Sequence, residues 1–144
     1  MREILFRGQT RKKGERVFVG TGKPVDGNWV YGGVFQGEGD FSIIYSYKPI
    51  EKHTVYTDTV GQFTGLIDKN GKKIFEGDIV KIHRKYLNAG CEEDCLYEVI
   101  WHKHWCSWAL RNLKPTQCCY LSDAKDGEII GNKWDNPELL GEQQ

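Results

Sequence analysis

The chain of 144 residues balances 20 Lys and Arg against 20 Asp and Glu, so its formal net charge is zero. That balance argues against a protein that coats nucleic acid with its whole surface, although it is compatible with a local basic patch. No run of about 18 apolar residues suggests a membrane span, and the N-terminus lacks the apolar core of a signal peptide. We therefore expect a soluble cytoplasmic protein with no membrane contact.

The first part of the chain alternates between short strand patterns and connections rich in glycine. Aromatic and β-branched residues that alternate with smaller ones favour strands with one face turned to a core. Two of these patterns flank the glycines of residues 36–40 and are expected to form a hairpin. The strands expected here are residues 2–8, Arg16–Val19, Trp29–Phe35, Phe41–Tyr47 and His53–Thr57.

The most regular stretch of the chain is Val60–Ile82. Asn70 and Gly71 supply the positive φ angles of a tight turn between two apolar runs, which predicts a hairpin. A second turn at residues 76–78 precedes a β-branched strand over residues 79–82, and this order of strands and turns resembles segments of small SH3-like barrels. We attribute the acidic residues of the stretch to turn chemistry and not to a cation site. They are Asp68, Glu76 and Asp78.

The remaining segments are less regular. His83–Cys95 contains a glycine and three consecutive acidic residues, and it is expected to be an irregular, exposed insertion. Tyr97–Leu110 is expected to be one strand that bends near Cys106. Glu128–Asn132 is the last expected strand, and Asp135–Leu140 can form one turn of helix with a proline near its start.

Glycine occurs 17 times and aromatic residues make up 12% of the chain, which favours a mainly β protein with little helix. We expect an N-terminal antiparallel β unit over residues 1–57. A small SH3-like β-barrel unit is expected over residues 58–140, followed by a tail at 141–144.

Three separated stretches together resemble the YopX family of phage and prophage proteins. They are Met1–Arg7, the middle stretch from Val60–Leu66 through Asp68–Gly71 to Ile74–Val80, and Ile129–Asn132 with Asn136–Leu140. The resemblance implies a phage or prophage origin, a mostly β fold and expression in the bacterial cytoplasm. It implies no activity, and residues 8–57 and 83–127 contain no stretch that we can align with the family's pattern, so no role is assigned to their Cys and His residues.

Cysteine and histidine residues of the second half could in principle hold zinc, which takes four thiolate or imidazole ligands in structural sites. On a single strand, His102, His104 and Cys106 would project from one face, and Cys91 and Cys95 could form a further pair. The odd count of 5 Cys and the missing second short pair instead favour reduced thiols and exposed imidazoles. We assign no metal ligand and no cofactor.

No catalytic residue is assigned either. Neighbours on one face of a strand lie about 6–7 Å apart, which is long for a hydrogen bond between His104 and Cys106. No third group is indicated, as a nucleophilic site would need. The glycines lack the Lys-Ser/Thr pair of a phosphate loop. We expect a protein that is not an enzyme.

Binding to nucleic acid is the first of two remaining hypotheses. Small β-barrels bind single strands through aromatic side chains beside basic ones, and both kinds occur in the N-terminal part. The basic residues are Arg2, Arg7, Arg11, Lys12, Lys13 and Arg16, and the aromatic ones are Trp29, Tyr31, Phe35, Tyr45 and Tyr47. A balanced charge removes the long-range attraction that drives such binding, so this hypothesis ranks second.

Binding to protein ranks first. Trp101, Trp105 and Trp108 fall on both faces of one segment, so at least one of them must meet solvent or a partner, and aromatic residues are enriched at interface cores. We therefore expect a non-enzymatic accessory protein that self-associates or binds a phage or host protein.

Overall fold

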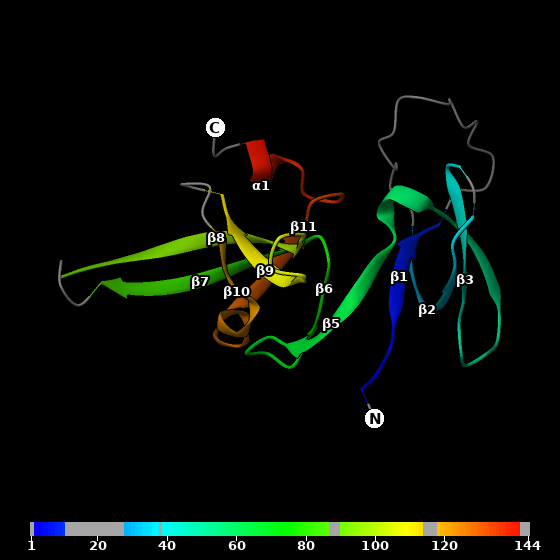
Figure 1. Cartoon of the computed structure of the whole chain (residues 1–144), viewed down its shortest axis with the longest axis horizontal. Coiled ribbons are helices and arrows are strands. Elements are labelled where there is room, and N and C mark those ends of the chain that lie inside the picture. Colours follow the sequence, from blue (N-terminus) through cyan, green and yellow to red (C-terminus); the bar gives the residue numbers. More distant parts are fainter. Residues whose placement is uncertain (1, 11–27, 38, 87–89, 114–117, 142–144) are drawn as a thin grey trace. The chain divides into compact units, whose positions relative to one another are not determined.

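The described strands form two antiparallel sheets, shown in Figure 1. The structure is a computed structural model. It describes residues 2–10, 28–37, 39–86, 90–113 and 118–141, and the backbone only of Cys91. Contacts divide the chain into two units, Met1–Phe63 and Thr64–Gln144, whereas the sequence suggested a division after residue 57. The two units are described separately below.

The first sheet has the strand order β4-β3-β2-β1-β5-β6, and its first four strands belong to the first unit. They are β1 (Phe6–Gln9), β2 (Trp29–Phe35), β3 (Phe41–Tyr45) and β4 (Lys52–Tyr56), followed by the short 3₁₀ helix η1 (Thr57–Thr59). The strand β5 (Gly61–Ile67) begins beside β1, where Gly61 pairs with Arg7. An isolated bridge from Thr10 to Val55 also brings the end of β1 against β4.

The interior of the first unit is small and tightly packed. Ile44 and Val55 are completely buried. A Cβ atom on Gly8 would lie 2.8 Å from Val55, so β1 and β4 approach each other as closely as a glycine allows. The buried backbone N–H of Gln9 donates to Thr59 Oγ1 at 2.9 Å, which fixes η1 against β1.

The second unit contains the five-stranded sheet β10-β9-β8-β7-β11. The strands of this sheet are β7 (Asp78–Tyr86), β8 (Cys91–His102), β9 (Ser107–Asn112), β10 (Cys118–Tyr120) and β11 (Glu128–Asn132). The second unit also contains β6 (Lys73–Phe75), which follows β5 in the first sheet. Its short helices are η2 (Leu121–Asp126) and α1 (Glu138–Gly141). All pairings within the five-stranded sheet are antiparallel.

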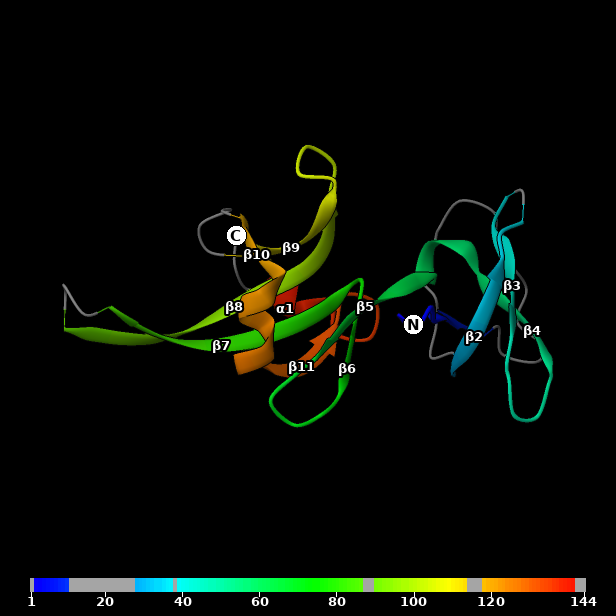
Figure 2. The same ribbon diagram turned by 60° about the horizontal axis from the view of Figure 1, so that its bottom comes forward.

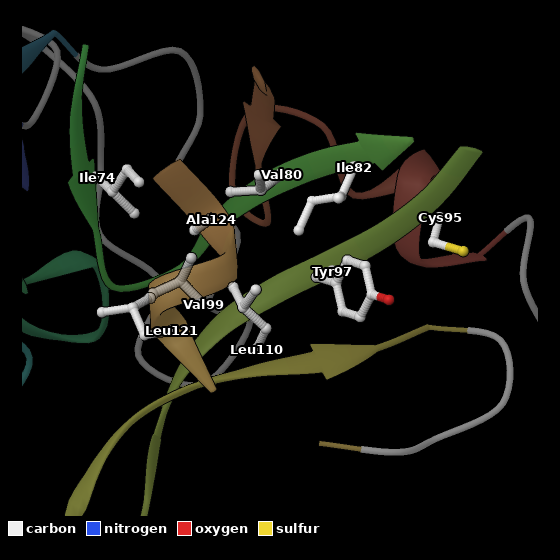
Figure 3. Packing of buried hydrophobic residues seen from close by; sticks show 9 residues of the cluster. All are labelled: Ile74, Val80, Ile82, Cys95, Tyr97, Val99, Leu110, Leu121 and Ala124. Atoms are coloured by element: carbon white, nitrogen blue, oxygen red, sulfur yellow. The ribbon is translucent and has the colours of Figure 1, made fainter. Parts of the chain in front are cut away.

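One hydrophobic core lies on one face of this sheet. Figure 3 shows its side chains pointing toward one another between the strands and η2, which supplies Leu121 and Ala124. The other members are Ile74, Val80, Ile82, Cys95, Tyr97, Val99 and Leu110. Val80 and Ile82 of β7 and alternate residues from Cys95 to Val99 of β8 enter this core, as the two-residue period of a strand requires.

The carboxylate of Asp68 connects the β5–β6 turn to β11. Asp68 Oδ1 accepts hydrogen bonds from the backbone N–H groups of Asn70 and Lys72, each at 2.9 Å. Its Oδ2 accepts the N–H of Ile129 at 3.0 Å. Burial raises the pKa of Asp68, but these three hydrogen bonds outweigh it, so the pKa lies below its ordinary value of 3.8.

The β6–β7 turn packs against Trp134. Gly77 has a φ angle of +86°, and a Cβ atom there would overlap the Trp134 ring. The turn also contains Asp78, whose Oδ2 accepts the N–H of Phe75 at 2.7 Å. Gly71, at the preceding turn, has a φ of +81° but faces open space. The two glycines therefore differ in packing and not in backbone conformation.

The far ends of β7 and β8 form a two-stranded arm, His83–Tyr86 with Cys91–Cys95, which extends from the sheet in Figures 1 and 2. Among the described strands, β11 pairs with β7 only as far as Lys81. On one face of the arm, His83 Nδ1 lies 2.9 Å from Asp94 Oδ1 and Nε2 lies 3.1 Å from Glu92 Oε2. These hydrogen bonds raise the pKa of His83.

The mainly β fold is confirmed, with two antiparallel sheets and little helix. The expected hairpin of Trp29–Phe35 with its neighbour forms, as does that of the Asn70-Gly71 turn, and Glu128–Asn132 is β11. The helical turn α1 begins directly after Pro137. No described helix is long and apolar enough to cross a membrane. The strand expected at Arg16–Val19 lies outside the described residues.

Three structural expectations are corrected. The C-terminal unit is not a closed barrel in its described part, because its sheet ends at β10 and β11, which do not pair with each other. His83–Cys95 is not irregular in its described part: charged residues face each other across the two strands of the arm, as His83 does with Asp94. Tyr97–Leu110 is not one strand, because the chain reverses after His102, with Cys106 at a φ of 48°.

We predict that Gly77→Ala lowers the free energy of unfolding by about 2–3 kcal/mol, because the left-handed backbone and the overlap with Trp134 both oppose a methyl group. Gly71→Ala carries only the backbone cost, about 1 kcal/mol. Urea unfolding followed by tryptophan fluorescence compares the two. Equal losses would mean that the contact with Trp134 does not constrain the turn.

We predict that Asp68→Asn destabilises the second unit by about 2 kcal/mol at neutral pH, because an amide cannot accept all three backbone hydrogen bonds. Since the folded-state pKa of Asp68 is lowered, its stabilisation is present above the unfolded-state pKa and is lost as the pH falls through the folded-state value. The difference from the unchanged protein should therefore shrink in acid. The exposed Asp126→Asn is the control, and amide exchange at Ile129 reports the same loss locally.

We predict that the imidazole of His83 titrates above its ordinary pKa of 6.5. A raised folded-state pKa means that the contribution of His83 to stability is present below pH 6.5 and is lost as the pH rises through the folded-state value. An NMR titration of the ring protons measures this. Asp94→Asn should lower the midpoint, and Asp126→Asn should leave it in place; a midpoint unmoved by Asp94→Asn would exclude the ion pair in solution.

Candidate functional site

The first candidate surface is an aromatic sheet face on the first unit. The strand register places Tyr45 opposite Gly33, Phe35 opposite Ile43 and Phe41 opposite Tyr56, and residues opposite each other share a face. We define the aromatic sheet face as Tyr31, Phe35, Phe41, Ile43, Tyr45 and Tyr56. The exposed fraction is 45% for Tyr31, 65% for Phe35 and 43% for Tyr45.

This face lies opposite the buried interior of the first unit. Ile44 and Val55, on the other side of β3 and β4, are completely buried. Phe41 and Tyr56 hold each other with ring centroids 5.4 Å apart. The aromatic sheet face is therefore an outer surface that is backed by the buried side chains of Ile44 and Val55. Its six members are uncharged.

Next to this face, Arg7 lies against Trp29. The guanidinium carbon of Arg7 is 4.4 Å from the centre of the Trp29 ring, a cation–π contact, and Arg7 is buried at 6% exposure. Of the basic residues in the nucleic-acid hypothesis, Arg7 is thus covered and Arg2 is exposed. Arg11, Lys12, Lys13 and Arg16 lie outside the described residues.

The second candidate surface is a stack of three rings on the second unit, His102, Trp105 and Tyr120. His102 and Trp105 stack with centroids 4.2 Å apart at 22°, and Trp105 and Tyr120 with centroids 5.5 Å apart at 30°. Trp105 is 43% exposed and Tyr120 is 74% exposed. We call these three residues the ring stack. The turn that carries Trp105 projects beyond the sheet in Figure 2.

The β8–β9 turn positions Trp105 over His102. The backbone N–H of Trp105 donates to His102 Nδ1 at 3.2 Å, and the thiol of Cys106 donates to the Lys103 carbonyl at 3.3 Å. A φ of 48° at Cys106 is uncommon for a residue with a side chain and carries a local energetic cost. The turn is thus held by several constraints at once, and the Trp105 ring is held with it.

The position of Tyr120 follows from the strand register. Tyr120 pairs with Ala109, which pairs with Ile100, and His102 lies two residues beyond Ile100. All four residues therefore share the face of the sheet opposite to the hydrophobic core. The sequence analysis did not find Tyr120, because only the pairing of β10 with β9 brings it to the β8–β9 turn.

Two of the residues considered as metal ligands come together. The rings of His102 and His104 lie 6.0 Å apart between centroids, but both lie at the end of β8 and in its turn, and not along one strand with Cys106. Cys95 is buried in the core of the second unit, and the side chain of Cys91 is outside the described residues. Within the described part of the chain, no three His, Cys, Asp or Glu side chains are grouped to hold a metal ion.

The arm has its own set of polar contacts. The hydroxyl of Tyr86 donates to Glu93 Oε1 at 2.8 Å, and the thiol of Cys95 donates to the same oxygen at 3.5 Å. Burial raises the pKa of Cys95, and the hydrogen bond to Glu93 raises it further. A raised pKa keeps the thiol protonated near neutral pH, which makes Cys95 a poor nucleophile.

Trp101 and Trp105 are exposed to 48% and 43%, as expected for tryptophans on both faces of one segment. Trp101 packs edge-on against Trp108, with centroids 5.2 Å apart, on the core side of the sheet. Trp101 is thus about as exposed as Trp105 but lies on the other face of the sheet, outside the ring stack.

Comparisons with known proteins identify a family and similar solved structures. The pattern of the family described as YopX protein matches residues 35–141. No match was found among curated proteins. The crystal structure of protein EF1440 from Enterococcus faecalis is 28% identical, with 70% of this chain and 75% of that chain covered and a TM-score of 0.41. Because the family match spans most of the sequence, including both the Asp68 turn and the β6–β7 turn, the chain belongs to the YopX family.

Proposed function

We propose that this protein is a non-enzymatic accessory protein of a phage or prophage, that it acts in the bacterial cytoplasm through protein contacts, and that its aromatic sheet face binds a second copy of the chain. Membership of the YopX family supports the origin. The observation that carries the binding role is the exposure of Tyr31, Phe35 and Tyr45 on one firmly supported face.

Exposed aromatic rings on one face favour an interface. A single exposed apolar side chain is ordinary on a protein surface, whereas a group of them on adjacent strands marks an interaction site. Phe35 and Tyr45 lie on neighbouring strands, and Ile43 lies directly across from Phe35. Aromatic rings bury a large apolar area at little cost in conformational entropy, and they dominate the binding energy of many interfaces.

The exposed rings of the aromatic sheet face are uncharged, which favours a second copy as the partner. In a two-fold symmetric dimer each surface meets itself, so any charge near the axis would meet an equal charge. Tyr31, Phe35 and Tyr45 carry none and can meet their own copies without that repulsion. Two positive charges lie directly opposite members of this face. Lys52 is opposite Tyr45 on the edge strand β4, where it would lie at the polar rim of the interface, and Arg7 is opposite Tyr31, where its side chain is buried against Trp29.

The same face is less suited to nucleic acid. Binding to phosphates requires accessible Lys and Arg side chains, and the Arg7 side chain beside this face is buried against Trp29. Arg7 is therefore not accessible to a phosphate at a nucleic-acid site next to Tyr31 and Tyr45. For this surface, contact with protein is the better supported function.

We predict that Tyr45→Gln weakens self-association at least about tenfold, which corresponds to about 1.4 kcal/mol. Sedimentation velocity over a range of protein concentrations measures the dissociation constant. Tyr86→Gln is the matched control, since Tyr86 is also 43% exposed but lies on the arm. Phe35→Gln should have the same effect as Tyr45→Gln. A monomer at all concentrations, or equal weakening by Tyr86→Gln, would refute the proposed interface.

A further inference from the structure

We propose that the ring stack on the second unit is a binding site for single-stranded nucleic acid, in which a nucleobase stacks on the outer face of Tyr120 and Lys103, in the same turn as Trp105, meets a phosphate. This site is separate from the aromatic sheet face, which belongs to the first unit. It does not depend on self-association.

The geometry offers an open aromatic surface at the end of an ordered stack. Tyr120 has one ring face toward Trp105, yet it is 74% exposed, so its other ring face is open to solvent. Trp105 in turn rests on His102. A planar base placed on Tyr120 would become the fourth ring of the series, and each such base stacked on an aromatic side chain contributes about 1–3 kcal/mol.

The rings are set in place before any ligand arrives. The hydrogen bond from the Trp105 N–H to His102 Nδ1 holds Trp105 over His102, and the pairing of Tyr120 with Ala109 places Tyr120 beside Trp105, where the two rings stack. Side chains already held in their bound arrangement lose less conformational entropy on binding. The unusual backbone of Cys106, with its φ of 48°, is the local cost of that arrangement.

The charge of this segment fits an anionic partner. Between Glu98 and Asp123 the sequence contains no Asp or Glu, whereas it contains Lys103 in the β8–β9 turn and Arg111, which is paired with Glu98. Both flanking acids are already engaged: Glu98 is 4% exposed and pairs with Arg111 and Lys133, and Asp123 accepts from Arg84 at 3.2 Å. No acidic residue within the segment therefore opposes a phosphate near the ring stack.

Stacking selects a single strand over a duplex. The bases of a duplex are already stacked on one another and paired, so their π faces are not free to meet Tyr120. Bases of a single strand are free, and each of them has a π face, so the site is expected to tolerate different sequences. Phosphate contacts from Lys103 would make the affinity fall as salt rises.

The test is fluorescence anisotropy with labelled homopolymer oligonucleotides of about 12 nucleotides, a length within the usual site size, at low salt and with the full chain. We expect Tyr120→Ala and Trp105→Ala each to weaken binding about tenfold or more. Tyr120→Phe, which keeps the ring, should retain most of the affinity. Trp101→Ala is the matched control and should bind as the unchanged protein does.

Two further probes separate stacking from simple charge attraction. An abasic strand with the same number of phosphates and a duplex of the same length should both bind more weakly than the single strand. The Tyr45→Gln variant of the first unit should bind the oligonucleotide normally. The proposal is overturned if no homopolymer binds at low salt, if the abasic strand or the duplex binds equally well, or if Trp101→Ala weakens binding as much as Trp105→Ala.

Discussion

The fold of the second unit depends on one buried carboxylate. Asp68 closes the β5–β6 turn through the N–H groups of Asn70 and Lys72, and it reaches across to Ile129 at the beginning of β11. A backbone hydrogen bond from Lys69 to Gly127, at 3.0 Å, reinforces the link. Since β11 is the edge strand beside β7, this carboxylate joins a local turn to the five-stranded sheet. Asp68, which the sequence marks as a turn residue, thus also makes a long-range contact with β11.

The most recognisable stretch of the chain is therefore scaffold. Asp68 and Asp78 accept backbone hydrogen bonds, the glycines supply turns, and Gly77 also makes room for Trp134. The exposed aromatic surfaces lie elsewhere, on β2 and β3 in one unit and at the β8–β9 turn in the other.

Local signals in the sequence were sufficient for much of the fold. The Asn70-Gly71 turn and the alternation of Trp29–Phe35 depend on backbone conformation and on the period of a strand, both of which a short segment determines. The arm was missed because its strands are polar, and their pairing depends on contacts such as His83 with Asp94 across the turn. The ring stack was missed because its third member, Tyr120, is brought in by the register of β10, which no local pattern specifies.

The net charge of zero is the sum of segments that differ in their content of acidic residues. Three consecutive acids, Glu92–Asp94, occupy the arm, where they pair with His83, Lys85 and Tyr86. The segment between Glu98 and Asp123 has none. Electrostatic attraction is screened over roughly 8–10 Å at physiological salt, so a ligand at the ring stack responds to the nearby cations and not to the whole chain. Overall charge balance therefore argues against a protein that coats nucleic acid, but it is compatible with a small stacking site beside Lys103.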